Sequence, residues 1–92
     1  QELSFYDQSL GHEGTEALVQ AMETRVKEVS LYDDITLDIE AFTKYGSRGK
    51  CKEVGCYEEN AAKYRRQLRS WASKKGWDVT EDDGEYFEMK KN

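Results

Sequence analysis

The stretch EENAAKYRRQLRSWASKKG, residues 58–76, predicts a helix, because apolar side chains recur within it at helical spacing. Acidic residues open the stretch, while Lys74 and Lys75 close it, as suits the two ends of a helix dipole. Gly76 stands where a C-terminal cap glycine is expected. The predicted apolar face consists of Ala61, Tyr64, Leu68, Trp71 and Ala72.

The residues after this helix predict a β-hairpin over 77–89. A three-residue loop, Asp82-Asp83-Gly84, would pair Val79 with Phe87 and Trp77 with Met89 on one face. Gly84 would then supply the left-handed residue with which such loops commonly end.

A second helical pattern lies in the N-terminal half, where Thr15 is a plausible N-cap. The apolar residues of this helix recur at steps of four, four and three: Leu18, Met22, Val26 and Val29. Residues 2–6 fit either a short strand or a loose N-terminal arm that covers residues 1–12.

Residues 31–45 are ambiguous. Apolar side chains alternate with polar ones from Ile35 to Ala41, which favours a half-buried strand. Ile35, Ile39 and Phe42 also fit a helix capped by Asp33 or Asp34. We favour the strand because the alternation is the stricter match. After the break at residues 46–49, residues 50–54 predict a second strand.

These elements predict a small single α+β domain over residues 1–92, with two helices packed on one face of a short antiparallel sheet. The chain is expected to end in a helix plus a β-hairpin. A chain of 92 residues has a small core, so a deep substrate cavity is not expected. The predicted core comprises Leu18, Met22, Val26, Ile35, Leu37, Ile39, Tyr64, Leu68, Trp71, Val79 and Phe87.

Cys51 and Cys56 are best interpreted as reduced structural thiols, with a disulfide as the less favoured alternative. A zinc site would need four ligands, and the one histidine, His12, is remote from both cysteines in the sequence. We therefore expect no metal and no cofactor. Since no apolar run is long enough for a transmembrane helix, we expect a cytoplasmic protein without a membrane partner. The alternative that a leader peptide has been cleaved from the chain is left open.

Charge is sorted along the chain, whose net charge is −5. Residues 1–43 are strongly acidic, residues 44–75 are basic, and residues 76–92 are acidic again. A candidate acidic partner-binding surface comprises Asp33, Asp34, Asp38 and Glu40. Such carboxylates could imitate a nucleic-acid backbone and occupy the binding groove of another protein. They could equally serve only to keep a small domain soluble.

The basic segment predicts a second surface, for nucleic acid or for a partner, formed by Arg48, Lys50, Lys63, Arg65, Arg66 and Arg69. A helix with arginines on one flank, followed by a hairpin, is the layout of a winged helix module. The acidic hairpin tip, residues 81–83, would oppose phosphate and weakens that hypothesis. The simplest alternative is a basic helix face that pairs with the chain's own acids.

Catalysis has little support, since a lone histidine in a glycine-rich segment is usually just solvated. We therefore expect no enzyme. The sequence favours a small acidic protein that binds another macromolecule, most plausibly a protein, as an inhibitor or adaptor. A nucleic-acid-binding module that uses the helix at residues 58–75 is the alternative. A homodimer, in which the basic helix of one copy meets the acidic block of another, also fits.

Overall fold

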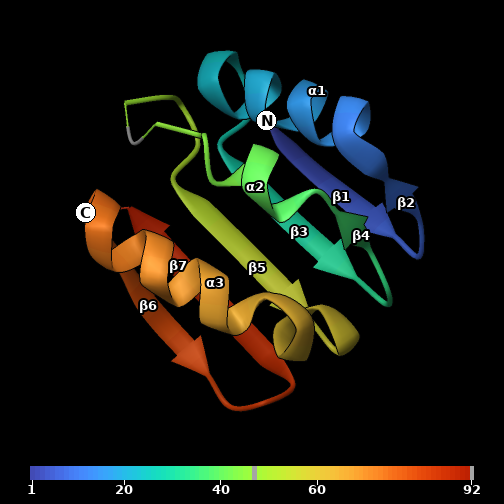
Figure 1. Cartoon of the computed structure of the whole chain (residues 1–92). Helices are drawn as coiled ribbons and strands as arrows, with labels where there is room; N and C mark the ends of the chain where they lie inside the picture. The colour runs from blue at the N-terminus through green and yellow to red at the C-terminus, as the bar shows by residue number, and fades with distance from the viewer. Residues whose placement is uncertain (47, 92) are drawn as a thin grey trace.

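The computed structural model describes residues 1–46 and 48–91, which form one α+β domain. Three helices of this part of the chain, where two were expected, lie on the same face of a five-stranded sheet (Figure 1). The sheet order is β1-β3-β5-β7-β6. Its strands are β1 (Glu2–Tyr6), β3 (Glu28–Tyr32), β5 (Glu53–Tyr57), β6 (Trp77–Asp82) and β7 (Tyr86–Lys91), and the helices are α1 (Gly11–Thr24), α2 (Ile39–Phe42) and α3 (Glu59–Lys75).

The sheet is mixed, so the expectation of an antiparallel sheet is wrong for half of it. Strands β1, β3 and β5 are parallel, whereas β7 is antiparallel to both β5 and β6. Parallel neighbours need a crossover connection, and α1 and the α2 segment return the chain to the start of the next strand. Two short strands, β2 (Ser9–Leu10) and β4 (Thr36–Leu37), pair in a separate small sheet.

The parallel half repeats one unit. Leu3, Val29 and Val54 are register partners on β1, β3 and β5, and they lie about 25 residues apart in the chain. Each unit consists of a strand, a turn and a helix, and the units stack side by side as in a short solenoid.

Strand alternation divides the sheet into two faces. Apolar residues such as Val29, Leu31 and Phe87 point to the helices and are buried in the core. The opposite face, here named the open face, carries the residues that alternate with them. These are Glu2, Ser4, Tyr6, Glu28, Ser30, Tyr32, Glu53, Gly55, Tyr57, Tyr86, Glu88 and Lys90.

The first helix begins and ends earlier than predicted. It ends at Thr24, so Val26 follows the helix and Val29 belongs to β3. Both side chains are buried, because the chain turns directly from a buried helix face into a buried strand. Thr15 is not the N-cap: its hydroxyl donates to the Gly11 carbonyl and accepts from the Asp38 amide, joining α1 to the next unit.

The strand favoured for residues 35–41 is also wrong. In this segment the strand β4 comprises Thr36 and Leu37 alone, and Ile39–Phe42 form α2. A helix was the alternative, but its cap is Asp38 rather than Asp33 or Asp34, because the Asp38 carboxylate accepts from the Ala41 amide. The strand predicted at residues 50–54 lies at Glu53–Tyr57, and residues 2–6 form the outer strand β1 rather than a loose arm.

The helix predicted over residues 58–76 is confirmed as α3. Its five predicted apolar residues are buried, and Gly76 ends it with φ of 77°. The C-terminal hairpin is confirmed too, but its predicted register is wrong, because Val79 pairs with Met89. A bulge between Val79 and Glu81 absorbs one residue, and the turn forms at 83–85, where Asp83 accepts from two backbone amides.

The predicted core residues are buried, except Ile39 and Val79, which are partly buried. Tyr45, Trp77 and Cys51 also belong to the core. Cys51 and Cys56 are free thiols, and burial raises the pKa of Cys51 to about 11 and that of Cys56 to about 12. Both thiols are therefore protonated at neutral pH and act as small apolar side chains.

Candidate partner-binding face

A row of four tyrosines crosses the open face. Tyr6, Tyr32, Tyr57 and Tyr86 come from β1, β3, β5 and β7. Successive ring centroids lie 4.7, 4.4 and 4.5 Å apart, with interplanar angles of 6°, 14° and 30°. These separations are close to the spacing of adjacent strands, so the rings stack without distorting the sheet.

Residues in the middle of the open face hold the row in place. A Cβ atom at Gly55 would lie 3.4 Å from Cε2 of Tyr57 and 3.5 Å from Cε1 of Tyr86, so both rings lean over this glycine. The Tyr86 hydroxyl donates to the Glu88 carboxylate, and burial together with this hydrogen bond raises the pKa of Tyr86. Burial and the neighbouring Tyr57 raise the pKa of Tyr32 in the same way. Tyr32 and Tyr86 are therefore uncharged at neutral pH.

Carboxylates lie on one side of the tyrosine row, in register on three neighbouring strands. Glu2 pairs with Glu28, and Glu28 pairs with Glu53. Burial raises the pKa of Glu28, and repulsion from Glu2 and Glu53 adds to that shift. Lys90 partly offsets this charge, with Nζ 3.8 Å from Oε1 of Glu53 and 3.9 Å from Oε1 of Glu88.

Further acids follow the tyrosines at the ends of the parallel strands. Asp7, Asp33 and Glu58 come directly after Tyr6, Tyr32 and Tyr57. All three have a positive φ, of 45°, 64° and 59°. A non-glycine residue with positive φ costs roughly 1 kcal/mol or more. A positive φ therefore recurs at the same place in all three parallel units, although Glu58, with ψ of −123°, lies outside the left-handed helical region.

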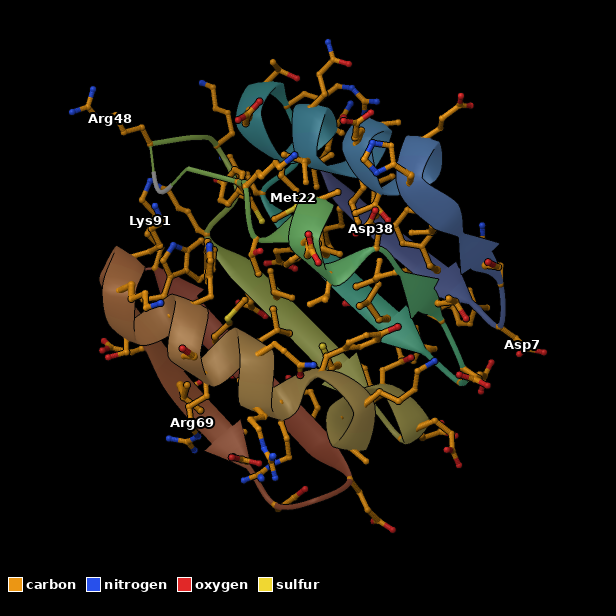
Figure 2. The ribbon with its side chains drawn as sticks, in the orientation of Figure 1. Asp7, Met22, Asp38, Arg48, Arg69 and Lys91 are labelled. Atoms are coloured by element: carbon orange, nitrogen blue, oxygen red, sulfur yellow. The ribbon has the colours of Figure 1, made fainter. Side chains whose placement is uncertain are left out.

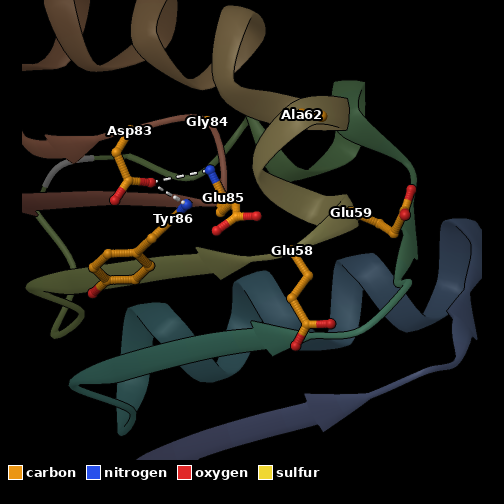
Figure 3. A pocket seen from close by; sticks show the side chains of 7 residues that line it. All are labelled: Glu58, Glu59, Ala62, Asp83, Gly84, Glu85 and Tyr86. Carbon is orange, nitrogen blue, oxygen red and sulfur yellow. Dashed lines mark hydrogen bonds between the residues drawn. The ribbon is translucent and has the colours of Figure 1, made fainter.

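A cavity of about 650 Å³ lies between the start of α3 and the hairpin turn at residues 83–85 (Figure 3). Its lining includes Glu58, Glu59, Asp83 and Glu85, together with Tyr86. Asp83 is engaged in the hairpin turn through its bonds to the Glu85 and Tyr86 amides. The edge of the open face at which the parallel strands β1, β3 and β5 end is thus acidic as well.

Two of the four acidic residues predicted as a binding surface are engaged within the protein. Asp34 pairs with Lys63 at 2.7 Å, and Asp38 lies 2.7 Å from Nδ1 of His12. The hydrogen bond that His12 donates to Asp38, with the charge of Glu16, raises the pKa of His12, and the same bond lowers the pKa of Asp38. Asp33 comes directly after Tyr32, at the end of β3, and Glu40 is exposed on α2.

The predicted basic surface is divided between two places. Arg48 and Lys50 lie on the loop after α2, where Lys50 and Cys51 bond to the end of α1, whereas Arg69 lies on α3 (Figure 2). Lys63, also on α3, is paired with Asp34. The structure therefore does not bring the six bases together.

Two arginines of α3 hold the hairpin. Arg65 donates to both carboxylate oxygens of Asp82 at 2.8 and 2.6 Å, and Arg69 donates to Oδ2 at 2.7 Å. Arg65, with Arg69 beside it, lowers the pKa of Asp82 to about 2. These two bases therefore pair with the chain's own acid, as the simplest sequence interpretation suggested.

Arg66 lies in a different setting. It lines a shallow groove of about 470 Å³ together with Lys74 and Lys75, with Thr43 and Trp71 on its walls. The Trp71 ring nitrogen donates to the Thr43 carbonyl, and the Trp71 side chain is 5% exposed, so little of it is accessible.

Sequence reasoning missed the tyrosine row, although a signal for it exists. The order apolar, small, apolar, tyrosine, acid recurs at residues 3–7, 29–33 and 54–58. The pattern was missed because each copy is short and the segments between the copies differ in length and structure.

Within residues 1–46 and 48–91, no cluster of side chains is suited to hold a metal ion. No helix in the same ranges has the length and apolarity to span a membrane. No significant match to the chain was found among models of protein families, curated proteins or solved structures. The function must therefore be inferred from the geometry of the open face.

Proposed function

We propose that this chain is a non-enzymatic protein-binding module that docks its partner on the open face. The stacked tyrosine row is the observation that carries this proposal. Tyr6 is 59% exposed, and the other three rings are half-buried. Tyrosines offer a large, amphipathic contact area, and rings already stacked lose little conformational freedom on binding.

Charge favours a protein over a nucleic acid as the partner on this face. Proteins that bind single strands combine aromatic platforms with a basic groove that follows the phosphates. Glutamates lie beside the tyrosine row, and Lys90 is already paired with two of them. Phosphates brought to this face would be repelled.

The roles of inhibitor or adaptor, including the acidic nucleic-acid mimic, belong to this proposal as narrower forms. If the chain acts as a nucleic-acid mimic, its acidic surface would occupy the nucleic-acid-binding groove of the partner protein. Asp33 and Glu40, which are exposed and lie outside the open face, would contribute to that surface.

The test compares proteins captured from lysate by three immobilised forms of the chain: wild type, the Tyr32→Thr/Tyr57→Thr variant, and the Asp33→Asn/Glu40→Gln variant. We expect a specific partner whose recovery falls at least about tenfold with the tyrosine variant, because central contact tyrosines commonly dominate interface energy. The acid variant should retain that partner. Recovery unchanged by the tyrosine substitutions would reject the open face, and loss with the acid variant alone would favour the originally predicted acidic surface.

A nucleic-acid module on α3 is the second candidate, supported by the groove that Arg66 forms with Lys74 and Lys75. Labelled duplex and single-stranded DNA would be titrated at low salt into wild type and Arg66→Ala/Lys74→Ala. Micromolar binding that the variant loses would support this candidate. The absence of binding at low salt would exclude it.

A further inference from the structure

The partner chemistry of the open face can be narrowed from the arrangement of its charges. This step rests on the proposed function. The row of Glu2, Glu28 and Glu53 runs across the strands, parallel to the tyrosine row and four residues before it on each strand. At about 3.3 Å per strand residue the two rows lie roughly 13 Å apart. An occupant that crosses the strands between them, over Ser4, Ser30 and Gly55, would therefore reach both rows through long side chains.

The carboxylates need a cationic neighbour. Glu2 and Glu28 face each other on adjacent strands, where like charges destabilise the pair. Lys90 lies at the β7 end of the row, within 4 Å of Glu53 and Glu88. A cation placed over Glu2 and Glu28 would relieve repulsion that the positive amino group of Gln1 offsets only in part.

The tyrosine row favours arginine over lysine as that cation. Inside the row, the faces of Tyr32 and Tyr57 are covered by neighbouring rings, so ring edges are presented. Tyr6, at the end of the row, stacks on Tyr32 with one face. Its other face lies at the outer strand of the sheet, in keeping with its 59% exposure. A guanidinium stacks flat on such a face and pairs with a carboxylate through two parallel hydrogen bonds, whereas an ammonium does neither.

We propose that the open face binds an arginine-containing, basic polypeptide segment that lies across the strands, with guanidinium groups on Glu2 and Glu28 and on the exposed face of Tyr6. The partner's remaining side chains pack on the edges of the tyrosine rings.

The test titrates the full chain at low salt with ten-residue peptides of alternating Arg and Ser, Lys and Ser, or Gln and Ser. Binding would be followed by calorimetry and by amide NMR shifts. The arginine peptide should bind several-fold more tightly than the lysine peptide, and the glutamine peptide should not bind measurably. Shifts should concentrate on β1 and β3.

Two matched variants separate the open face from general attraction to an acidic protein. Glu2→Gln/Glu28→Gln should weaken binding of the arginine peptide roughly tenfold. Glu13→Gln/Glu40→Gln removes the same charge from the exposed side of α1 and α2 and should leave the affinity within about twofold. Circular dichroism would verify that both variants are folded.

Equal weakening by the two variants, equal affinity for arginine and lysine peptides, or no binding of the arginine peptide would each overturn the inference. If the lysate partner still depends on Tyr32 and Tyr57 in those cases, the proposed function survives and only the arginine chemistry is rejected. If the peptide binds but no captured protein depends on the tyrosines, the docking role fails instead.

Discussion

At the scale of single residues, Gly55 shows how one missing side chain permits the tyrosine row. It is buried beneath the rings of Tyr57 and Tyr86, in the middle strand of the sheet. A methyl group there would make ordinary van der Waals contacts with both rings, but a branched side chain would enter the space that they occupy.

We therefore expect Gly55→Ala to change the free energy of unfolding by less than about 0.5 kcal/mol, while Gly55→Val lowers it by roughly 1–3 kcal/mol. Urea denaturation would measure the stability, and near-UV circular dichroism would report the tyrosine packing. An alanine variant as unstable as the valine variant would mean that the rings lie closer to the backbone than described.

His12 provides a second test at this scale, because it is the one histidine of the chain and gives an unambiguous NMR signal. The hydrogen bond that its ring donates to Asp38 raises the pKa of His12, with a smaller contribution from Glu16. In Asp38→Asn the pKa of His12 should fall towards its ordinary value. Glu40→Gln, two residues further on, should leave it unchanged, and a fall in both variants would assign the shift to general charge.

The sign of the linkage follows from the direction of that shift. Since folding raises the pKa of His12, the interaction stabilises the protein below the unfolded pKa. It is lost as the pH rises through the folded value.

At the scale of elements, Asp82 joins α3 to β6. Its carboxylate accepts three hydrogen bonds from Arg65 and Arg69, and its side chain is 8% exposed. The arginines are about half exposed, so solvent screens the pairs and keeps their contribution small.

We expect Asp82→Asn to lower the free energy of unfolding at pH 7 by roughly 0.5–1 kcal/mol, the upper range for a surface pair with bidentate geometry. The folded pKa of about 2 lies below the unfolded value of about 3.9. The contribution is therefore present above pH 4 or so, and is lost as the pH falls towards 2. Urea denaturation between pH 2 and 7 would measure it.

Asp78→Asn, on the same strand, serves as the control for that measurement. The free energy of unfolding of this control should depend on pH in the same way as that of the wild type. If the stability difference between Asp82→Asn and the wild type were as large at pH 2 as at pH 7, the ion-pair account would be contradicted.

The elements also show what could be predicted from the sequence. Helix α3 was predicted within a residue or two, because its periodicity, its terminal charges and Gly76 all agree. The end of α1 was wrong, because Val26 and Val29 continue a helical spacing although the chain has already turned. Strand β5 was displaced because Gly55 and Cys56 give it no alternating apolar and polar pattern. Local spacing contains no information on such long-range packing.

For the whole molecule, the mixed sheet places β1 and β6 at its two outer positions. On β1, the amide of Asp7 donates to Tyr32 and the carbonyl of Gln1 accepts from Glu28, so odd-numbered residues bond to β3. The backbone groups of Ser4 and Tyr6 consequently point outward.

Hydrogen exchange should reveal this alternation, with slow amides at Leu3 and Phe5 and fast amides at Ser4 and Tyr6. NMR at low protein concentration would measure it residue by residue. Equal protection of all four amides would mean that another strand covers the outer side of β1.

The whole molecule also explains why the candidate site was hard to predict. Charge blocks suggested separate acidic and basic surfaces, but folding pairs Lys63 with Asp34 and two arginines with Asp82. The tyrosines of the open face are up to 80 positions apart in the sequence and become neighbours only through the sheet register. A pattern that depends on register cannot be recognised before the strands are placed.

The bulge between Val79 and Glu81 affects how molecules of this protein associate at high concentration. It interrupts the regular spacing of backbone groups on β6, and Asp78 and Glu81 add like charges to that strand, so another molecule finds a poor template there. Strand β1 is regular along all five residues. Two molecules can therefore pair through their β1 edges. Growth of a fibre would need β6 as a second pairing edge, and the bulge and charges of β6 oppose this.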